Sequence, residues 1–165
     1  MNRLIFQILL IILVWSSQFN YTLAGNNFVL QPGDIFLTRK DKSNFTPGYW
    51  NHTAIYVGGN DIVEAQAIPH KVIISNLQDF WNKYPEIKIV RYPNKEKAEK
   101  AAEYARKMIG QKYWLEASIF RYLKPSSRGE NCVSVVRRSY LYSTGINYIW
   151  KKPDNINNFS TIYRK

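Results

Sequence analysis

Two short apolar runs around a glycine turn constrain the fold of this chain most. Residues 52–57 alternate as a half-buried strand does, and residues 62–65 form a second strand-like run. The tripeptide Gly58-Gly59-Asn60 between them is typical of a tight turn. The pattern predicts a β-hairpin, which needs further strands or helices to cover its apolar side chains.

The rest of the chain offers those partners. Further strands are predicted at residues 35–38, 72–74 and 87–90, and amphipathic helices at residues 94–110 and 131–144. With 165 residues, 45% of them hydrophobic, the chain is long enough for one sizeable core and too short for two ordinary domains. We therefore expect a single α+β domain over residues 25–165, with a small antiparallel sheet packed against helices.

Residues 1–24 have the pattern of a secretory signal. Arg3 precedes an apolar run over residues 4–15, and small residues stand just before Gly25. The run is about a dozen residues long, whereas a membrane-spanning helix needs ~20. We predict cleavage after Ala24 and a periplasmic or extracellular protein. An uncleaved N-terminal anchor is the alternative.

The charge of the chain limits its partners. Loss of residues 1–24 removes one charge, that of Arg3, and lowers the net charge from +11 to +10. Such a field favours an anionic membrane or an acidic envelope polymer, although a merely solvated basic surface is an equal alternative. No RNA-module signature or zinc-finger spacing indicates nucleic acid. Neither a Gly-rich phosphate loop nor a metal-ligand spacing is present, so no cofactor and no metal are predicted.

Cys132 is the single cysteine of the chain, which excludes an internal disulfide framework and a Cys-rich zinc site. It directly follows Asn131, the expected cap of the second helix, and so lies in the first turn. Unsatisfied N–H groups and the helix dipole stabilise a thiolate there, and the thiolate is the nucleophile. The alternative is a small buried hydrophobe.

The hairpin supplies two possible partners for that thiol. If residues 58–60 form a three-residue loop, Val57 pairs with Asp61 and Ala54 pairs with Glu64. Glu64 then lies on the same sheet face as His52, whereas a two-residue turn would point it the other way. A carboxylate in an apolar strand needs a partner, and His52 is the nearest candidate. These residues suggest a nucleophile (Cys132), a base (His52) and an orienting acid (Glu64).

The order of these motifs is similar to that of a known family. The segments 30–35, 51–58, 62–65 and 109–113 and the dipeptide Asn131-Cys132 together resemble the circularly permuted papain-like amidohydrolases, more closely the YaeF/YiiX-like (YycO-like) group of the NlpC-type superfamily. The resemblance implies a permuted papain-like fold. It also implies that the family's histidine, acidic residue and nucleophile correspond to His52, Glu64 and Cys132. Many relatives have Ser after the cysteine, where this chain has Val133.

The resemblance implies a thiol hydrolase of amide bonds, often in cell-wall-type peptides, that works through a thioester acyl-enzyme. The prediction is a secreted cysteine amidohydrolase for peptidoglycan-type or other small peptides. The lecithin:retinol acyltransferase-like group is one alternative, because it shares the motif order and an Asn-Cys dipeptide and acts on lipid esters. It usually has a second histidine where this chain has Glu64. An inactive, basic binding module is a third hypothesis.

Overall fold

The computed structural model of the chain describes residues 28–39, 48–114 and 130–165, so the predicted signal over residues 1–24 lies outside the described residues. The described strands form one six-stranded antiparallel sheet in the order β4-β3-β2-β1-β5-β6. The strands are β1 (Ile35–Arg39), β2 (His52–Gly58), β3 (Asp61–Gln66), β4 (Lys71–Asn76), β5 (Glu86–Arg91) and β6 (Ser160–Arg164), and the helices are α2 (Leu77–Lys83), α3 (Lys95–Lys107), α4 (Cys132–Thr144) and the short 3-10 helix η2 (Pro153–Asn155). This is the expected α+β class.

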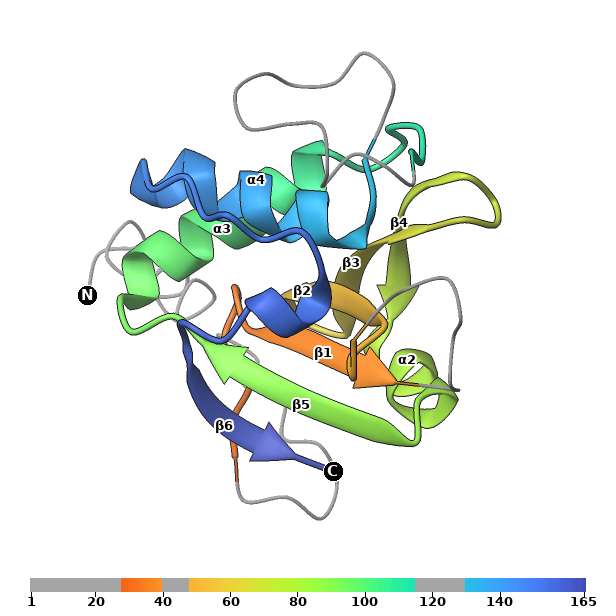
Figure 1. Cartoon of the computed structure of the whole chain (residues 1–165), viewed down its shortest axis with the longest axis horizontal. Helices are drawn as coiled ribbons and strands as arrows, with labels where there is room; N and C mark the ends of the chain where they lie inside the picture. Colours follow the sequence, from red (N-terminus) through yellow and green to blue (C-terminus); the bar gives the residue numbers. More distant parts are fainter. Residues whose placement is uncertain (1–27, 40–47, 115–129) are drawn as a thin grey trace, which may run out of the picture.

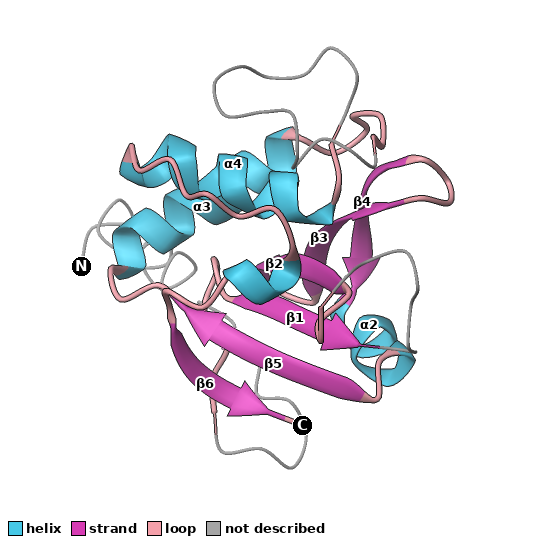
Figure 2. Ribbon diagram, in the orientation of Figure 1, coloured by secondary structure: helices cyan, strands magenta, loops and turns pink. Residues whose placement is uncertain are grey.

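Both faces of the sheet are covered, so the inner strands are apolar at successive positions. Helices α3 and α4 lie side by side over one face, and α2 packs near the other (Figures 1 and 2). Alternate residues of the strands therefore enter two separate apolar clusters. The cluster under α3 and α4 includes Ile55 and Val63, whereas the cluster near α2 includes Ala54 and Ile62.

Both predicted long helices are confirmed, although α3 ends at Lys107, with Met108 as its cap, rather than at residue 110. The side chain of Asn94 caps α3 by accepting a 2.9 Å hydrogen bond from the N–H of Lys97. Helix α4 begins at Cys132, directly after its cap Asn131, and ends at Gly145, whose φ of 74° suits a residue without a side chain. Small residues on α3 let that helix approach the sheet closely.

The hairpin turn differs from the predicted one. Gly58, not Val57, pairs with Asp61, so the turn itself contains only two residues, Gly59 and Asn60. The expected three-residue loop is therefore wrong. A β-bulge between Tyr56 and Gly58 adds the missing residue to β2 and restores the register expected further along, with Ile55 opposite Val63. Because of this bulge, His52 and Glu64 still share one face of the sheet.

Two elements add to the predicted set. Leu77–Lys83 form α2, which is capped by Asn76, in a segment whose sequence indicates only a short helical or irregular connection. The strand β6, near the C-terminus, was not predicted. It pairs with β5 and forms one edge of the sheet. None of the helices within the described ranges has the length and apolar character that crossing a membrane requires.

Candidate active site

The start of α4 is fixed by reciprocal hydrogen bonds on either side of Cys132. The side-chain oxygen of Asn131 accepts a bond from the N–H of Ser134 (2.9 Å), and the hydroxyl of Ser134 accepts one from the N–H of Asn131 (2.8 Å). This capping box holds Cys132 as the first helical residue. The thiol remains partly exposed. It therefore lies at the positive end of the α4 dipole, as the sequence predicts.

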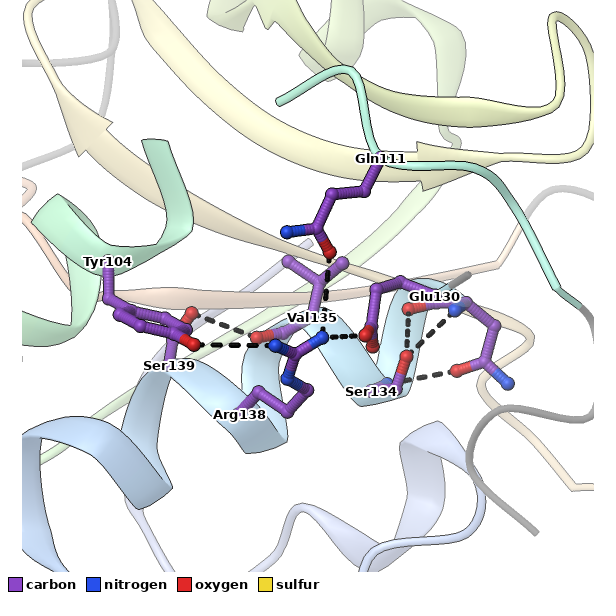
Figure 3. Close-up of polar contacts among 8 residues, drawn as sticks. Tyr104, Gln111, Glu130, Ser134, Val135, Arg138 and Ser139 are labelled. Carbon is purple, nitrogen blue, oxygen red and sulfur yellow. Dashed lines mark hydrogen bonds and ion pairs between the residues drawn. The ribbon is translucent and has the colours of Figure 1, made fainter. Parts of the chain in front are cut away.

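A buried ion pair anchors the same end of α4 from its other side (Figure 3). The carboxylate of Glu130, only 2% exposed, pairs with the guanidinium of Arg138 two turns along the helix. That guanidinium also donates to the hydroxyl of Tyr104 (3.3 Å) on α3 and to the side chain of Gln111 (3.5 Å). The residue that precedes Asn131-Cys132 is thus tied to both helices.

Replacing Arg138 by Met should destabilise the protein by about 3 kcal/mol, because Glu130 would stay buried without its cation. Denaturant unfolding followed by circular dichroism measures this free energy. Arg106→Met is the matched control, since Arg106 and Asp61 form an ion pair that is 41% exposed on each side. Such a pair contributes at most ~1 kcal/mol. Equal losses in the two variants would contradict an anchoring role for the buried pair.

The second part of the site joins β2 and β3. His52 and Glu64 lie beyond the last pair that joins β2 to β3, Ile55 with Val63. Nε2 of the imidazole is 2.6 Å from Oε2 of the carboxylate. The other carboxylate oxygen accepts bonds from the side chains of Gln66 (2.7 Å) and Ser75 (2.6 Å). The side chain of Glu64 is 1% exposed, so these bonds hold a buried carboxylate in one orientation.

The imidazole lies between that carboxylate and the thiol. His52 is the first residue of β2 and Cys132 the first residue of α4, and the two side chains are hydrogen-bonded partners at this end of the sheet. Because Glu64 occupies Nε2, Nδ1 is left for the thiol. The ring stacks on Tyr84 with centroids 5.7 Å apart and an interplanar angle of 15°, and Phe80 lies against it. These aromatic contacts restrict rotation of the imidazole.

The electrostatics of the pair favour the charged forms of both partners. Burial opposes the ionised carboxyl of Glu64, but hydrogen bonds from His52, Ser75 and Gln66 and the imidazolium charge lower its pKa to about 2. Burial likewise opposes the imidazolium, but the bonds and negative charges of Cys132 and Glu64 outweigh it and raise the pKa of His52 to about 10. At neutral pH, His52 therefore carries a proton between two acidic groups.

This ion pair predicts a pH window of maximal stabilisation. The contribution of Glu64 is complete above its unfolded pKa of ~4.3 and is lost as the pH falls toward about 2. The contribution of His52 is complete below its unfolded pKa of ~6.5 and is lost as the pH rises through about 10. Between pH ~4.3 and pH ~6.5 both contributions are complete, and the free energy of unfolding of the wild type should exceed that of Glu64→Gln by about 2 kcal/mol. A difference that is constant from pH 3 to pH 10 would contradict the pairing.

A tyrosine on another segment also lies near the thiol. Burial and then the negative charge of Cys132 raise the pKa of Tyr113 to about 12, so its phenol lies near the thiol and stays protonated. Residues 112–114 reach this position through backbone bonds to Glu130, which precedes the cysteine helix.

Sequence reasoning named three of these residues and missed the ones that support them. Cys132, His52 and Glu64 do come together. Gln66 was missed, although it lies two residues beyond Glu64 on the same face of a strand, which is a readable signal. The sequence carries no comparable signal for Ser75 or Tyr84, because the β3–β4 register and the path of α2 bring them to the site.

A comparison with protein families decides what kind of protein this is. A family model described as permuted papain-like amidase enzyme, YaeF/YiiX, C92 family, matches residues 29–156. The chain belongs to the C92 family. The predicted family and the permuted papain-like fold are thereby confirmed, with the histidine strand ahead of the cysteine helix.

A solved structure agrees on the fold of this C92-family protein. It is described as the crystal structure of metalloprotein YiiX from Escherichia coli O157:H7, with a TM-score of 0.56 and 21% sequence identity. The match covers 72% of this chain and 68% of that one. No curated protein matches the chain. Within the described residues, no group of three or more His, Cys, Asp or Glu side chains has an arrangement that fits a metal ion.

Proposed function

We propose that this C92-family protein is a cysteine hydrolase that cleaves amide bonds with a triad of Cys132, His52 and Glu64. The observation that carries the proposal is the position of His52, whose ring contacts the thiol and lies 2.6 Å from a buried carboxylate. A nucleophile, a proton carrier and an orienting acid in this order suit acyl transfer. The membership of the chain in a family described as amidases supports amides as the bonds that are attacked.

The reaction follows from the charges of the triad. The imidazolium of His52 favours the thiolate of Cys132, which attacks the carbonyl carbon of the amide. The C–N bond then breaks, and the leaving nitrogen takes the proton from His52, which leaves a thioester on Cys132. His52 next removes a proton from water, whose oxygen attacks the thioester. The C–S bond then breaks, which releases a carboxylic acid and restores the thiolate of Cys132 beside the imidazolium. Glu64 keeps the imidazole oriented throughout and stabilises its charged form.

The start of α4 supplies a further element of this mechanism. The first-turn N–H groups of a helix have no intrahelical acceptor, and they lie beside a side chain at the first helical position. The N–H of Ser134 already donates to the side chain of Asn131. We therefore assign the N–H groups of Cys132 and Val133 to the negative oxygen that develops when the carbonyl is attacked. This assignment needs only backbone groups, so Val133 in place of the serine of many relatives is compatible with it.

The proposed substrates are peptidoglycan-type or other small peptides, with lipid esters as the alternative that shares the same acyl-enzyme chemistry. The test incubates the chain lacking residues 1–24 with muropeptides that contain a diamino acid and, separately, with vesicles of phosphatidylglycerol and phosphatidylcholine. Mass spectrometry detects new products, and Cys132→Ala is the control. Cleaved peptides with intact lipids are expected. Acyl release from the vesicles with intact peptides would overturn the amidase assignment, and no product from either would favour the binding module.

We also propose that the protein is exported, on the basis of the signal pattern over residues 1–24. Expression of the full chain in a bacterium, followed by fractionation and N-terminal sequencing, tests this directly. The expected product begins at Gly25 and lies outside the cytoplasm. A full-length product retained in the cytoplasm would contradict export.

A further inference from the structure

Two lysines lie directly opposite each other beside the candidate site. Lys71, the first residue of β4, forms an antiparallel bridge with Lys112, in the segment that follows α3 (Figure 1). The bridge is flanked by backbone hydrogen bonds of 2.8 Å, from Tyr113 to His70 and from Val72 to Gln111. This is the closely spaced kind of antiparallel pair, with ~4.5 Å between Cα atoms. Two positive side chains are thus held on one face at short range.

This arrangement is unfavourable for the free protein. Like charges directly opposite each other in a sheet repel. Both lysines are exposed, and the ion pairs formed among the described residues include neither of them. On α3, in contrast, opposite charges lie close together, and Lys95 and Lys100 each pair with a glutamate. An anion from outside the chain would relieve the repulsion between Lys71 and Lys112.

The lysine pair is connected to the triad on two sides. Lys71 is the cross-strand partner of Gln66, whose side chain donates to Glu64, so Lys71 lies on the same face of the sheet as the carboxylate. On the other side, Lys112 directly precedes Tyr113, which lies near the thiol of Cys132. A neighbouring strand is ~4.8 Å away, and an extended peptide advances ~3.3–3.6 Å per residue. The carbonyl of Lys112 accepts a 2.7 Å bond from the N–H of Glu130, two residues before Cys132, so we expect the ammonium groups of the bridge to reach a substrate group one or two residues from the attacked bond.

We infer that Lys71 and Lys112 bind a carboxylate of the substrate, so that the protein selects acidic peptides over neutral ones. This inference rests on the proposed function, since it assigns part of the substrate of that same site. It places the acidic group next to the residue that contributes the scissile amide.

Affinity alkylation of Cys132 tests the inference. N-iodoacetylglycine and N-iodoacetyl-β-alanine carry a carboxylate a few bonds from the reactive carbon, and their primary amides are neutral counterparts. The measurement is the ratio of carboxylate to amide alkylation rates at pH 7 and low salt. We expect the ratio to fall roughly tenfold in Lys71→Gln/Lys112→Gln, and to shrink in the wild type at high salt.

The control is Lys95→Gln/Lys97→Gln, in the first turn of α3, which removes the same charge elsewhere. Its ratio should match the wild type. An equal fall in both variants would show that only the overall positive field acts and would overturn the assignment, as would no fall in either. If neither reagent labels wild-type Cys132, the proposed function fails. A second measurement then tests whether the lysine pair binds a carboxylate.

That second measurement uses Cys132→Ala with N-acetylglutamate and N-acetylglutamine as probes. The melting temperature should rise with N-acetylglutamate at low salt and not with N-acetylglutamine. The rise should disappear when Lys71→Gln/Lys112→Gln is added. A rise that survives in this variant, or no rise with intact lysines, would overturn the carboxylate site whatever the reactivity of the thiol.

Discussion

Replacement of Cys132 by Ala is expected to lower amide hydrolysis at least ~10⁴-fold, to the limit of detection. Cys132 is the only cysteine in the chain, so no second thiol is available as a nucleophile. The substitution should leave the fold intact, because the thiol is partly exposed and the cap of α4 uses Asn131 and Ser134 instead. Turnover of a cleaved muropeptide, followed by mass spectrometry, measures the loss.

Thermal unfolding of the same variant separates chemistry from folding. We expect its free energy of unfolding to lie within about 1 kcal/mol of the wild type. Residual hydrolysis above roughly one hundredth of the wild-type rate, in a variant with the wild-type melting temperature, would contradict a covalent role for the thiol.

Replacement of His52 by Ala is expected to lower hydrolysis ~10³-fold, since the substitution removes the residue proposed as both the base and the proton donor. It should also destabilise the protein by about 3 kcal/mol, because Glu64 is 1% exposed and would lose its cationic partner. The activity is measured well below the melting temperature of the variant, so that unfolding does not account for the loss.

His52→Gln is the matched control for that experiment. A glutamine side chain retains a donor toward Glu64 and should recover part of the stability, but it cannot carry a proton at neutral pH. Stability that recovers without activity supports proton transfer by His52. Activity that recovers with stability would indicate that His52 only holds the fold together.

The long-range arrangement of the site was predictable to the extent that local patterns encode it. Helix caps such as Asn94 and Asn131 are local signals, and both helices begin where the sequence predicts. The shared face of His52 and Glu64 was also predicted, although for an incomplete reason. The register depends on a β-bulge between Tyr56 and Gly58. Gly58 has a φ of 97°, but the glycines at 58 and 59 are equally typical of a three-residue loop, so the sequence does not distinguish the two turns.

The parts that were missed depend on contacts between segments distant in sequence. Ser75 reaches Glu64 only through the pairing of β3 with β4, and Tyr84 reaches His52 only through the path of α2. The buried pair of Glu130 and Arg138 is an i, i+8 contact, beyond the i, i+4 spacing at which helical charges are read from sequence. The edge strand β6 is short and mostly exposed, so its hydrophobic pattern is weak.

In the proposed mechanism, the charge on His52 is the feature that activates Cys132. The single most direct test is the rate of Cys132 alkylation by iodoacetamide from pH 5 to pH 10, in the wild type, His52→Ala and Glu64→Gln. We predict fast alkylation of the wild type already at pH 6, and a marked loss of the pH 6 reactivity in His52→Ala. Alkylation that begins only near pH ~8.5, as for an ordinary exposed thiol, and that neither substitution alters would contradict the account.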